Sequence, residues 1–279
     1  MLCEVCKKNE ATVRTTEVTE KGVKVTSLCE ACAAQRGLST RMASPTGRKK
    51  PRGPSFLGID LAAITRNAWN ATAFALLLDD LELAYAGVLC LGEKSARRAG
   101  LPKTGDWQEV VGGWVRVENA RLLQICHEEQ PALVAIDAPL SLSKGICGYG
   151  LRECDYMLMK GMGVKEKVRI IPTARLGALS SRGIHLKEIL QLAGHKVIEV
   201  HPRSSYQFLD ISLGSTEKIR SGLTRLGIKR LSPQALQRMG KAKRDILDAV
   251  CAAYTAWLHY HKKTVSLGNP QEGHLIVPK

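Results

Sequence analysis

Four cysteines near the start of the chain have the spacing of a metal site. They form two Cys-x2-Cys pairs, Cys3 with Cys6 and Cys29 with Cys32, separated by 22 residues. Paired thiolates of this kind hold Zn²⁺ in a closed tetrahedral site, which keeps no open position for catalysis. A reactive dithiol is the alternative interpretation. The pattern predicts a structural zinc site whose use is contact with protein or nucleic acid.

β-Branched runs between the two cysteine pairs predict a hairpin that brings them together. The runs cover 11–18 and 23–28, and they flank a turn-forming stretch at 19–22. A segment of about 34 residues is too short to build its own apolar core. Bound metal would therefore supply the folding free energy of a zinc-ribbon-like module at 1–34.

Two aspartates lie at the ends of segments that the sequence predicts as buried strands. Asp60 lies near the end of the strand predicted at 56–62, and Asp137 lies at the end of the strand predicted at 132–137, before Pro139 stops it. Ligand sites of open α/β sheets gather at strand ends, and a buried carboxylate must be solvated, paired or bound to metal. Either aspartate alone would more often be a turn or helix-cap residue.

A second pair of aspartates opens the last long helix predicted by the sequence. Asp245 and Asp248 are three residues apart, so they lie on one face within one turn and repel each other unless a cation is near. The alternative is that acids in the first turn complement the helix dipole. Four small residues further along would let this helix approach a sheet closely: Ala249, Ala252, Ala253 and Ala256.

Two further candidates share one face of the strand predicted at 196–201. Glu199 and His201 are two residues apart and could project toward one site, although an edge strand with a polar face explains the pattern equally well. Arg152 and Asp155 have helical spacing, for which an ion pair on a helix surface is the simpler account.

The remaining pattern predicts an α/β domain at 55–279 that contains a mixed sheet flanked by helices. We expect strands at 56–62, 72–78, 83–91, 132–137 and 196–201, and helices at 118–130, 150–160, 185–193, 215–226 and 243–261. Three strands, a helix, a strand, further helices, a strand and a terminal helix are typical of a ribonuclease-H-like layout.

The chain is strongly basic, with 41 Lys and Arg against 26 Asp and Glu and a net charge of +15. Segment 1–34 is neutral, whereas 35–54 contains six basic residues and no acid and reads as a flexible basic linker. The domain at 55–279 carries the remaining excess. This balance favours phosphate-rich partners, of which nucleic acid is the foremost.

Composition and hydropathy restrict the class of protein. An apolar content of 44% excludes wholesale disorder. We find no apolar run near the ~20 residues that a bilayer span needs. The first residues lack the apolar stretch of a secretory signal, so we expect a cytoplasmic protein without a membrane partner.

Both ends of the sequence resemble known families. Segments 3–13 and 28–33 are similar to the cysteine module of the activator of bacterial protein-arginine kinases. From residue 57 onward the chain resembles the DUF429 family, predicted nucleases with a ribonuclease-H-like fold. The matching stretches are 58–62 (Gly-Ile-Asp-Leu-Ala), 135–141 (Ala-Ile-Asp-Ala-Pro-Leu-Ser), 152–155 (Arg-x-Cys-Asp), 198–202 (Ile-Glu-Val-His-Pro), 245–253 (Asp-x-x-Asp-Ala-x-x-Ala-Ala) and 268–278. The Asp-x-x-Asp pair also resembles that of Holliday-junction resolvases of the RuvC type.

This resemblance implies a set of metal ligands and catalytic residues. The aspartates that would bind Mg²⁺ or Mn²⁺ are Asp60, Asp137, Asp245 and Asp248. Carboxylate oxygens suit these ions, which activate water and stabilise the leaving oxygen of a phosphodiester. Glu199 would complete the acidic set and His201 would assist proton transfer. Glu118 is a positional candidate for the glutamate that ribonuclease H carries on its first helix.

Three classes of function follow. The first is a divalent-metal-dependent nuclease that contacts a partner through its zinc module. The alternative is a non-catalytic zinc-containing adaptor that binds nucleic acid or protein, in which the acids serve stability. Phosphoryl transfer is a third class, but we see no glycine-rich phosphate loop between a strand and a helix.

Overall fold

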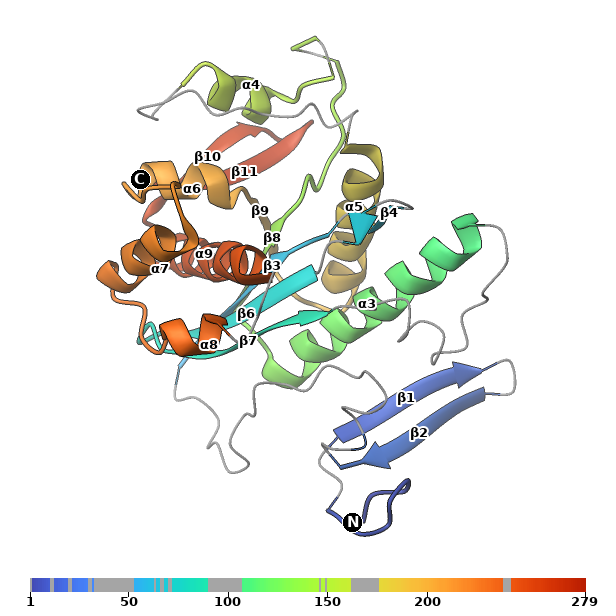
Figure 1. The fold of residues 1–279 in the computed structure, drawn as a ribbon. Helices are drawn as coiled ribbons and strands as arrows, with labels where there is room; N and C mark the ends of the chain where they lie inside the picture. The colour runs from blue at the N-terminus through green and yellow to red at the C-terminus, as the bar shows by residue number, and fades with distance from the viewer. Residues whose placement is uncertain are drawn as a thin grey trace.

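The structure is a computed structural model, and Figure 1 shows its fold. It describes residues 2–10, 13–19, 22–29, 32, 53–62, 64–65, 68–69, 72–89, 107–145, 147–148, 150–161, 176–237 and 242–279. Residues 35–52 of the expected basic linker and residues 20 and 21 of the expected hairpin turn lie outside these ranges.

A seven-stranded mixed sheet forms the centre of the main domain. Its strands are β3 (Ser55–Asp60), β6 (Thr72–Leu78), β7 (Leu83–Leu89), β8 (Leu133–Asp137), β9 (Val197–Val200), β10 (Thr264–Asn269) and β11 (Gly273–Pro278). They lie in the order β10-β11-β9-β8-β3-β6-β7. β3 and β6 are antiparallel, as are β6 and β7, whereas β3, β8 and β9 are parallel. The five strands from β7 to β9 have the topology of the expected ribonuclease-H-like fold.

Helices cover both faces of this sheet (Figure 1). They are α3 (Trp107–Glu129), α4 (Glu153–Met159), α5 (Gly177–Leu192), α6 (Pro202–Phe208), α7 (Thr216–Arg225), α8 (Pro233–Gln237) and α9 (Lys243–Tyr260). α3 and α5 pack against one face through Leu122, Ile125 and Leu186. α9 packs against the other face, and α6 and α7 pack against α9. None of the described helices combines the length and apolar character that a bilayer span requires.

The expected strands occur within two residues of their predicted ends, but several helices differ from expectation. α3 begins at Trp107, whereas the sequence predicted a start at 118. The first half was not predicted because Gly112 and Gly113 are poor helix formers and weaken the helical pattern there. α5 begins at Gly177 instead of 185. The periodicity did not predict α6 and α8, which have only seven and five residues and are too short to show an apolar repeat. It also missed the hairpin of β10 and β11.

Small two-stranded elements lie outside the main sheet. β1 (Val13–Thr19) and β2 (Gly22–Leu28) pair antiparallel in the register of the hairpin expected between the cysteine pairs. β4 (Ile64–Thr65) and β5 (Ala68–Trp69) form a second short pair.

The contact between α9 and β3 is very close. A Cβ atom built on Gly58 would lie 2.0 Å from the carbonyl oxygen of Ala249 and 2.3 Å from the backbone nitrogen of Ala253. Ala252 and Ala256 on the same helix are fully buried against the sheet. Because only small side chains separate the two backbones, the start of α9 is held beside the carboxyl ends of β3 and β8.

We predict that Gly58→Ala destabilises the fold by about 3 kcal/mol or more, because the new methyl group meets backbone atoms that cannot move independently. Gly177→Ala is the matched control. A Cβ atom there has open space, and alanine favours the helix by up to about 1 kcal/mol. Urea unfolding of both variants measures the difference, and a Gly58→Ala variant as stable as the parent would contradict the close approach.

Candidate functional site

Asp60 and Asp137 lie side by side at the carboxyl ends of two parallel strands. They are register partners of β3 and β8, so their side chains point to the same face of the sheet. Two residues earlier on β3 is Gly58, which faces α9. Both carboxylates therefore point to the face that α9 covers.

Asp245 and Asp248 approach this pair from the first turns of α9. Burial raises the pKa of Asp60 to about 8, and the charges of Asp248 and Asp245 add to this effect. The pKa of Asp137 lies well above its usual value, because this carboxyl is buried and the charges of Asp60 and Asp248 act on it. Burial also raises the pKa of Asp245 and of Asp248. The structure brings all four predicted aspartates together as one electrostatically coupled cluster.

Arg244 is the cation that lies within this aspartate cluster. Its Nε donates to Oδ2 of Asp248 at 2.9 Å, and its guanidinium carbon lies 5.3 Å from the centre of the Tyr206 ring. The other carboxylate oxygen of Asp248, Oδ1, is buried without a hydrogen bond of normal geometry from the described residues, and the hydroxyl of Tyr206 is near enough to lower the pKa of this carboxyl. The sequence analysis missed Arg244, although its spacing of four residues from Asp248 is that of a helical ion pair.

The donor set of the aspartate cluster would suit a divalent cation. Four carboxylates supply hard oxygen ligands, and one of their oxygens is buried without a hydrogen bond of normal geometry from the described residues. Among the residues that the structure describes, the four cysteines form a group whose ligand atoms all lie within 4.8 Å of one another, and the aspartates do not form such a group. The aspartates are therefore spaced more widely, which is the arrangement expected for carboxylates that repel one another and of which one is held by an arginine.

Glu199 points away from the face that carries the aspartate cluster, although its charge still helps to raise the pKa of Asp137. Its place in the acidic set stays a prediction. In the register of β8 and β9, Glu199 pairs with Ile136, and Asp137 pairs with Val200. Because successive side chains alternate between faces, Glu199 points to the opposite face from Asp137. Both of its oxygens accept hydrogen bonds from Arg152, at 2.5 and 2.7 Å.

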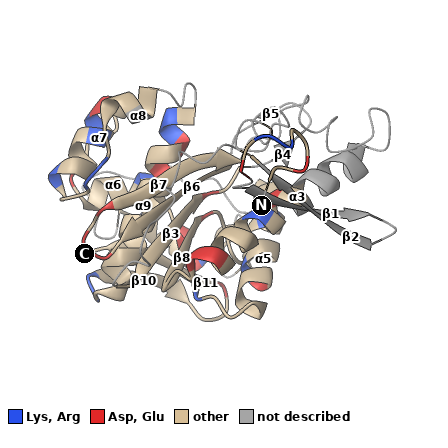
Figure 2. Ribbon diagram, turned by 90° about the horizontal axis from the view of Figure 1, so that it is seen from below, with Lys and Arg blue, Asp and Glu red and all other residues tan. Residues whose placement is uncertain are grey.

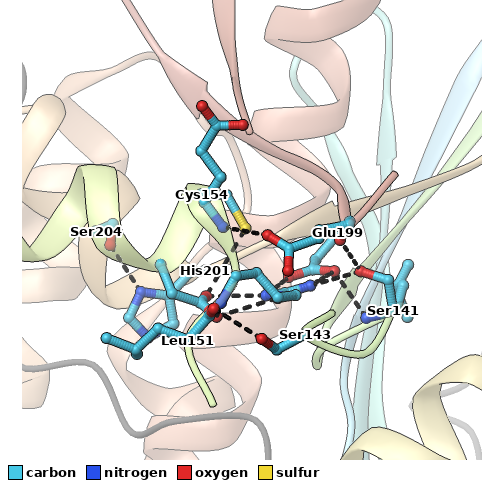
Figure 3. A network of polar contacts seen from close by, with 12 residues as sticks. Ser141, Ser143, Leu151, Cys154, Glu199, His201 and Ser204 are labelled. Carbon is cyan, nitrogen blue, oxygen red and sulfur yellow. Dashed lines mark hydrogen bonds and ion pairs between the residues drawn. The ribbon is translucent and has the colours of Figure 1, made fainter. Parts of the chain in front are cut away.

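Arg152 organises a buried network of its own (Figure 3). Its side chain is only 2% exposed, and it binds Asp155 as well as Glu199 through paired hydrogen bonds. It also donates to Oγ of Ser141, which in turn donates to the backbone carbonyl of Glu272. This is not the surface ion pair expected from the sequence. It ties the loop that follows Asp137 to β9, to α4 and to the turn between β10 and β11.

His201 lies at the edge of this Arg152 network. Its Nδ1 forms a hydrogen bond of 2.7 Å with Oγ of Ser204 (Figure 3). Burial lowers the pKa of the imidazole to about 4, and the positive charge of Arg203 adds to the effect. The ring is therefore neutral near pH 7. Its role in proton transfer stays a prediction.

Glu118 takes part in a third buried cluster. One oxygen of its carboxylate accepts hydrogen bonds from Nη2 of Arg182 at 2.6 Å and from the hydroxyl of Thr72 at 2.7 Å. Arg182 also donates to the backbone carbonyl of Ala62, two residues beyond Asp60. Glu118 thus supports the chain next to the aspartate cluster through Arg182, which the sequence analysis did not identify.

The four cysteines of the amino-terminal segment converge as their spacing predicted. Their sulfur atoms all lie within 4.8 Å of one another, and Cys3, Cys29 and Cys32 are buried. Backbone N–H groups outweigh the effect of burial and lower the pKa of Cys3 to about 6, whereas contact with Cys29 raises the pKa of Cys32 to about 12. Such a group stays partly protonated by itself, and a cation that binds four thiolates would ionise it fully.

Comparison with known proteins matches one family model and several solved structures. The family described as "Protein of unknown function (DUF429)" matches residues 58–272. Among solved structures, RuvC of Thermus thermophilus matches in complex with a Holliday junction substrate, with 14% identity, a TM-score of 0.41 and coverage of 74% of this chain and 96% of that chain. A second RuvC structure from Thermus thermophilus matches with 13% identity, a TM-score of 0.41 and coverage of 75% and 96%. None of the curated proteins matches the chain significantly.

The raised pKa of Asp60 predicts a pH-dependent effect of Asp60→Asn on stability. An aspartate in the unfolded chain ionises near its ordinary pKa of 3.8, whereas the folded state keeps the proton up to about pH 8. Stability of the metal-free protein therefore falls as the pH rises between these values. The amide of the Asp60→Asn variant cannot ionise, so we expect this variant to gain roughly 2–4 kcal/mol over the parent at pH 8 and clearly less at pH 5.

Thermal unfolding in buffer without added divalent ions measures this effect. Asp80→Asn is the control, because a hydrogen bond from the backbone of Glu82 lowers the pKa of Asp80. Removal of the Asp80 charge should therefore slightly destabilise the fold at neutral pH. A gain for Asp60→Asn that is equal at both pH values would show that the carboxyl titrates normally.

Proposed function

The chain belongs to the DUF429 family, and we propose that it is a divalent-metal-dependent nuclease that hydrolyses phosphodiester bonds of a nucleic acid. The observation that carries the proposal is the convergence of Asp60, Asp137, Asp245 and Asp248 at the ends of two parallel strands. Phosphodiester hydrolysis is a reaction for which carboxylates commonly hold the metal ions.

The cost of the aspartate cluster argues against a purely structural role. A carboxyl group whose pKa is raised by burial and like charge destabilises the folded state once the pH exceeds its ordinary value. By contrast, the pKa of Asp80 is lowered by its hydrogen bond from the backbone of Glu82, so its charge stabilises the fold. The cluster therefore favours a catalytic metal site over the alternative of a non-catalytic adaptor.

The basic balance of the chain suits a polyanionic substrate. The net charge is +15, and basic residues occur on α7 and in the first turn of α9, which also carries Asp245 (Figure 2). Phosphates attracted to these cations would reach the aspartate cluster only together with neutralising metal ions.

The residues of the site divide the work in this proposal between holding the metal ion, fixing the loop after Asp137 and carrying a proton. Asp60 and Asp137 would hold Mg²⁺ or Mn²⁺ from the rigid sheet, and Asp248 and Asp245 would hold it from α9. A metal ion bound there supplies activation of water and stabilisation of the leaving oxygen. Arg152 and its partners keep the loop after Asp137 in place. His201, neutral near pH 7, is the candidate proton carrier and would act as a weak base.

We further infer that Cys3, Cys6, Cys29 and Cys32 bind one structural Zn²⁺. Four buried or half-buried sulfur atoms within 4.8 Å of one another fit a tetrahedral thiolate site. In this proposal the metal stabilises the module that carries β1 and β2, and the module contacts nucleic acid or a protein partner.

Cleavage of nucleic acids tests the nuclease proposal. The purified chain would be incubated with Mg²⁺ or Mn²⁺ and labelled single strands, duplexes, DNA–RNA hybrids and branched junctions. We expect cleavage of at least one substrate, and a loss of about 100-fold or more in rate for Asp137→Asn, because that change removes a charged metal ligand. Asp80→Asn should cleave like the parent. Equal cleavage by Asp137→Asn, or no cleavage by the parent, would refute the proposal.

Metal content tests the zinc proposal. We expect elemental analysis of the purified chain to give about one Zn²⁺ per molecule. Cys29→Ser should lower this content strongly, whereas Cys126→Ser should not, because Cys126 is a buried core residue of α3. Removal of the metal with a strong chelator should unfold the module, since metal binding and folding are coupled in segments of this size. Zinc-free protein with an unchanged circular dichroism spectrum would contradict this inference.

A further inference from the structure

Arg244 has an unusual position for a cation at a candidate metal site. It precedes Asp245 directly and pairs with Asp248 one helical turn later through Nε and Oδ2. The side chain of Asp248 is 17% exposed and that of Arg244 is 35% exposed. The pair thus lies at the boundary between the buried cluster and solvent, where an ion pair stabilises the fold only modestly.

The guanidinium of Arg244 is incompletely used in this arrangement. Only Nε donates to an acceptor among the described residues, and the terminal Nη1 and Nη2 groups make no hydrogen bond to any of them. The ring of Tyr206 lies 5.3 Å away and holds the guanidinium from one side. Two parallel donors of a planar group are therefore available on the half-exposed side chain.

The ion pair and a bound metal ion compete for the same carboxylate. A divalent cation at Asp248 would lie close to the positive charge of Arg244, and the two repel each other. The oxygen that Arg244 occupies, Oδ2, is one of only two that Asp248 can offer. Conversely, without a metal ion Arg244 provides the compensation that keeps Asp248 from facing the other aspartates as an unpaired charge.

Resting on the proposed function, we propose that Arg244 is an internal counter-ion of the metal site, which a divalent cation displaces from Asp248 and whose released guanidinium then binds a phosphate of the nucleic acid substrate. The planar fork of arginine matches two phosphate oxygens. Displacement turns the side chain toward solvent, the direction from which a substrate arrives. Metal binding and substrate binding are thereby coupled through one residue, and the coupling is reciprocal.

The competition predicts tighter metal binding when Arg244 is neutralised. Mn²⁺ would be titrated calorimetrically into the full chain in buffer without added divalent ions. We expect Arg244→Gln to bind Mn²⁺ about three- to tenfold more tightly than the parent, the range that corresponds to loss of one partly exposed ion pair. Lys243→Gln is the matched control, since it removes the same charge from the neighbouring residue and should change the affinity by less than about twofold.

Two further variants separate failure of this inference from failure of the proposed function. Asp60→Asn should abolish the Mn²⁺ signal, which identifies it with the aspartate cluster. If Asp60→Asn abolishes binding but Arg244→Gln binds like the parent, only the role of Arg244 is refuted. If the parent does not bind Mn²⁺, or if Asp60→Asn binds it as well as the parent does, the metal site itself is refuted. Arg244→Lys keeps the charge and should bind Mn²⁺ like the parent; tight binding by this variant would contradict electrostatic competition.

The phosphate contact has its own readout. Binding of a short labelled nucleic acid would be measured by fluorescence anisotropy against salt concentration, with and without Ca²⁺ as a hard oxygen-binding ion. With Ca²⁺, Arg244→Gln should weaken binding and lower the slope of log affinity against log salt by about one, the effect of losing one phosphate contact. Without Ca²⁺, Arg244→Gln should bind like the parent. If Arg244→Gln weakens nucleic acid binding equally with and without Ca²⁺, or in neither condition, the proposed movement of Arg244 from Asp248 to a phosphate is refuted.

Discussion

The backbone contact between α9 and β3 is the constraint on which the rest of the site depends. At Gly58 the two elements approach until not even a methyl group fits between them. The small side chains of Ala249 and Ala253 are the matching feature on the helix. With α9 held at this distance, its first turns lie over the ends of β3 and β8, so Asp245 and Asp248 meet Asp60 and its register partner Asp137. The contact thus brings strand acids and helix acids to one point.

Much of this arrangement follows from the sequence. The apolar runs that end in Asp60 and Asp137 predict buried strands, and the spacing of Asp245 and Asp248 on an alanine-rich helix predicts a shared face that packs closely. All three elements occur where they were expected, because each is long or strongly patterned enough to be specified locally. The cysteine pairs of the first segment are a similar case, since their spacing determines the ligand set almost by itself.

The errors come from pairing between elements, which local patterns do not contain. The strand that carries Glu199 was predicted correctly, but the face to which Glu199 points is decided by the register of β9 against β8. That register pairs Val200, and not Glu199, with Asp137. Arg152 was equally misjudged, because helical spacing to Asp155 says nothing about Glu199, which is 47 residues away and forms a buried ion pair with it. The short helix α6 lay below the length at which periodicity is informative.

Three buried polar clusters in one domain differ in how many carboxyl groups share one guanidinium. Around Arg152, two carboxylates receive paired hydrogen bonds from one guanidinium. Around Arg182, a single carboxylate receives a charged partner and a hydroxyl. The aspartate cluster has four carboxyl groups and Arg244, and among the described residues it retains raised pKa values and a buried oxygen that lacks a hydrogen bond of normal geometry. Four carboxyl groups share one guanidinium in the aspartate cluster, and this uncompensated negative charge is what a divalent cation would neutralise in the function we propose.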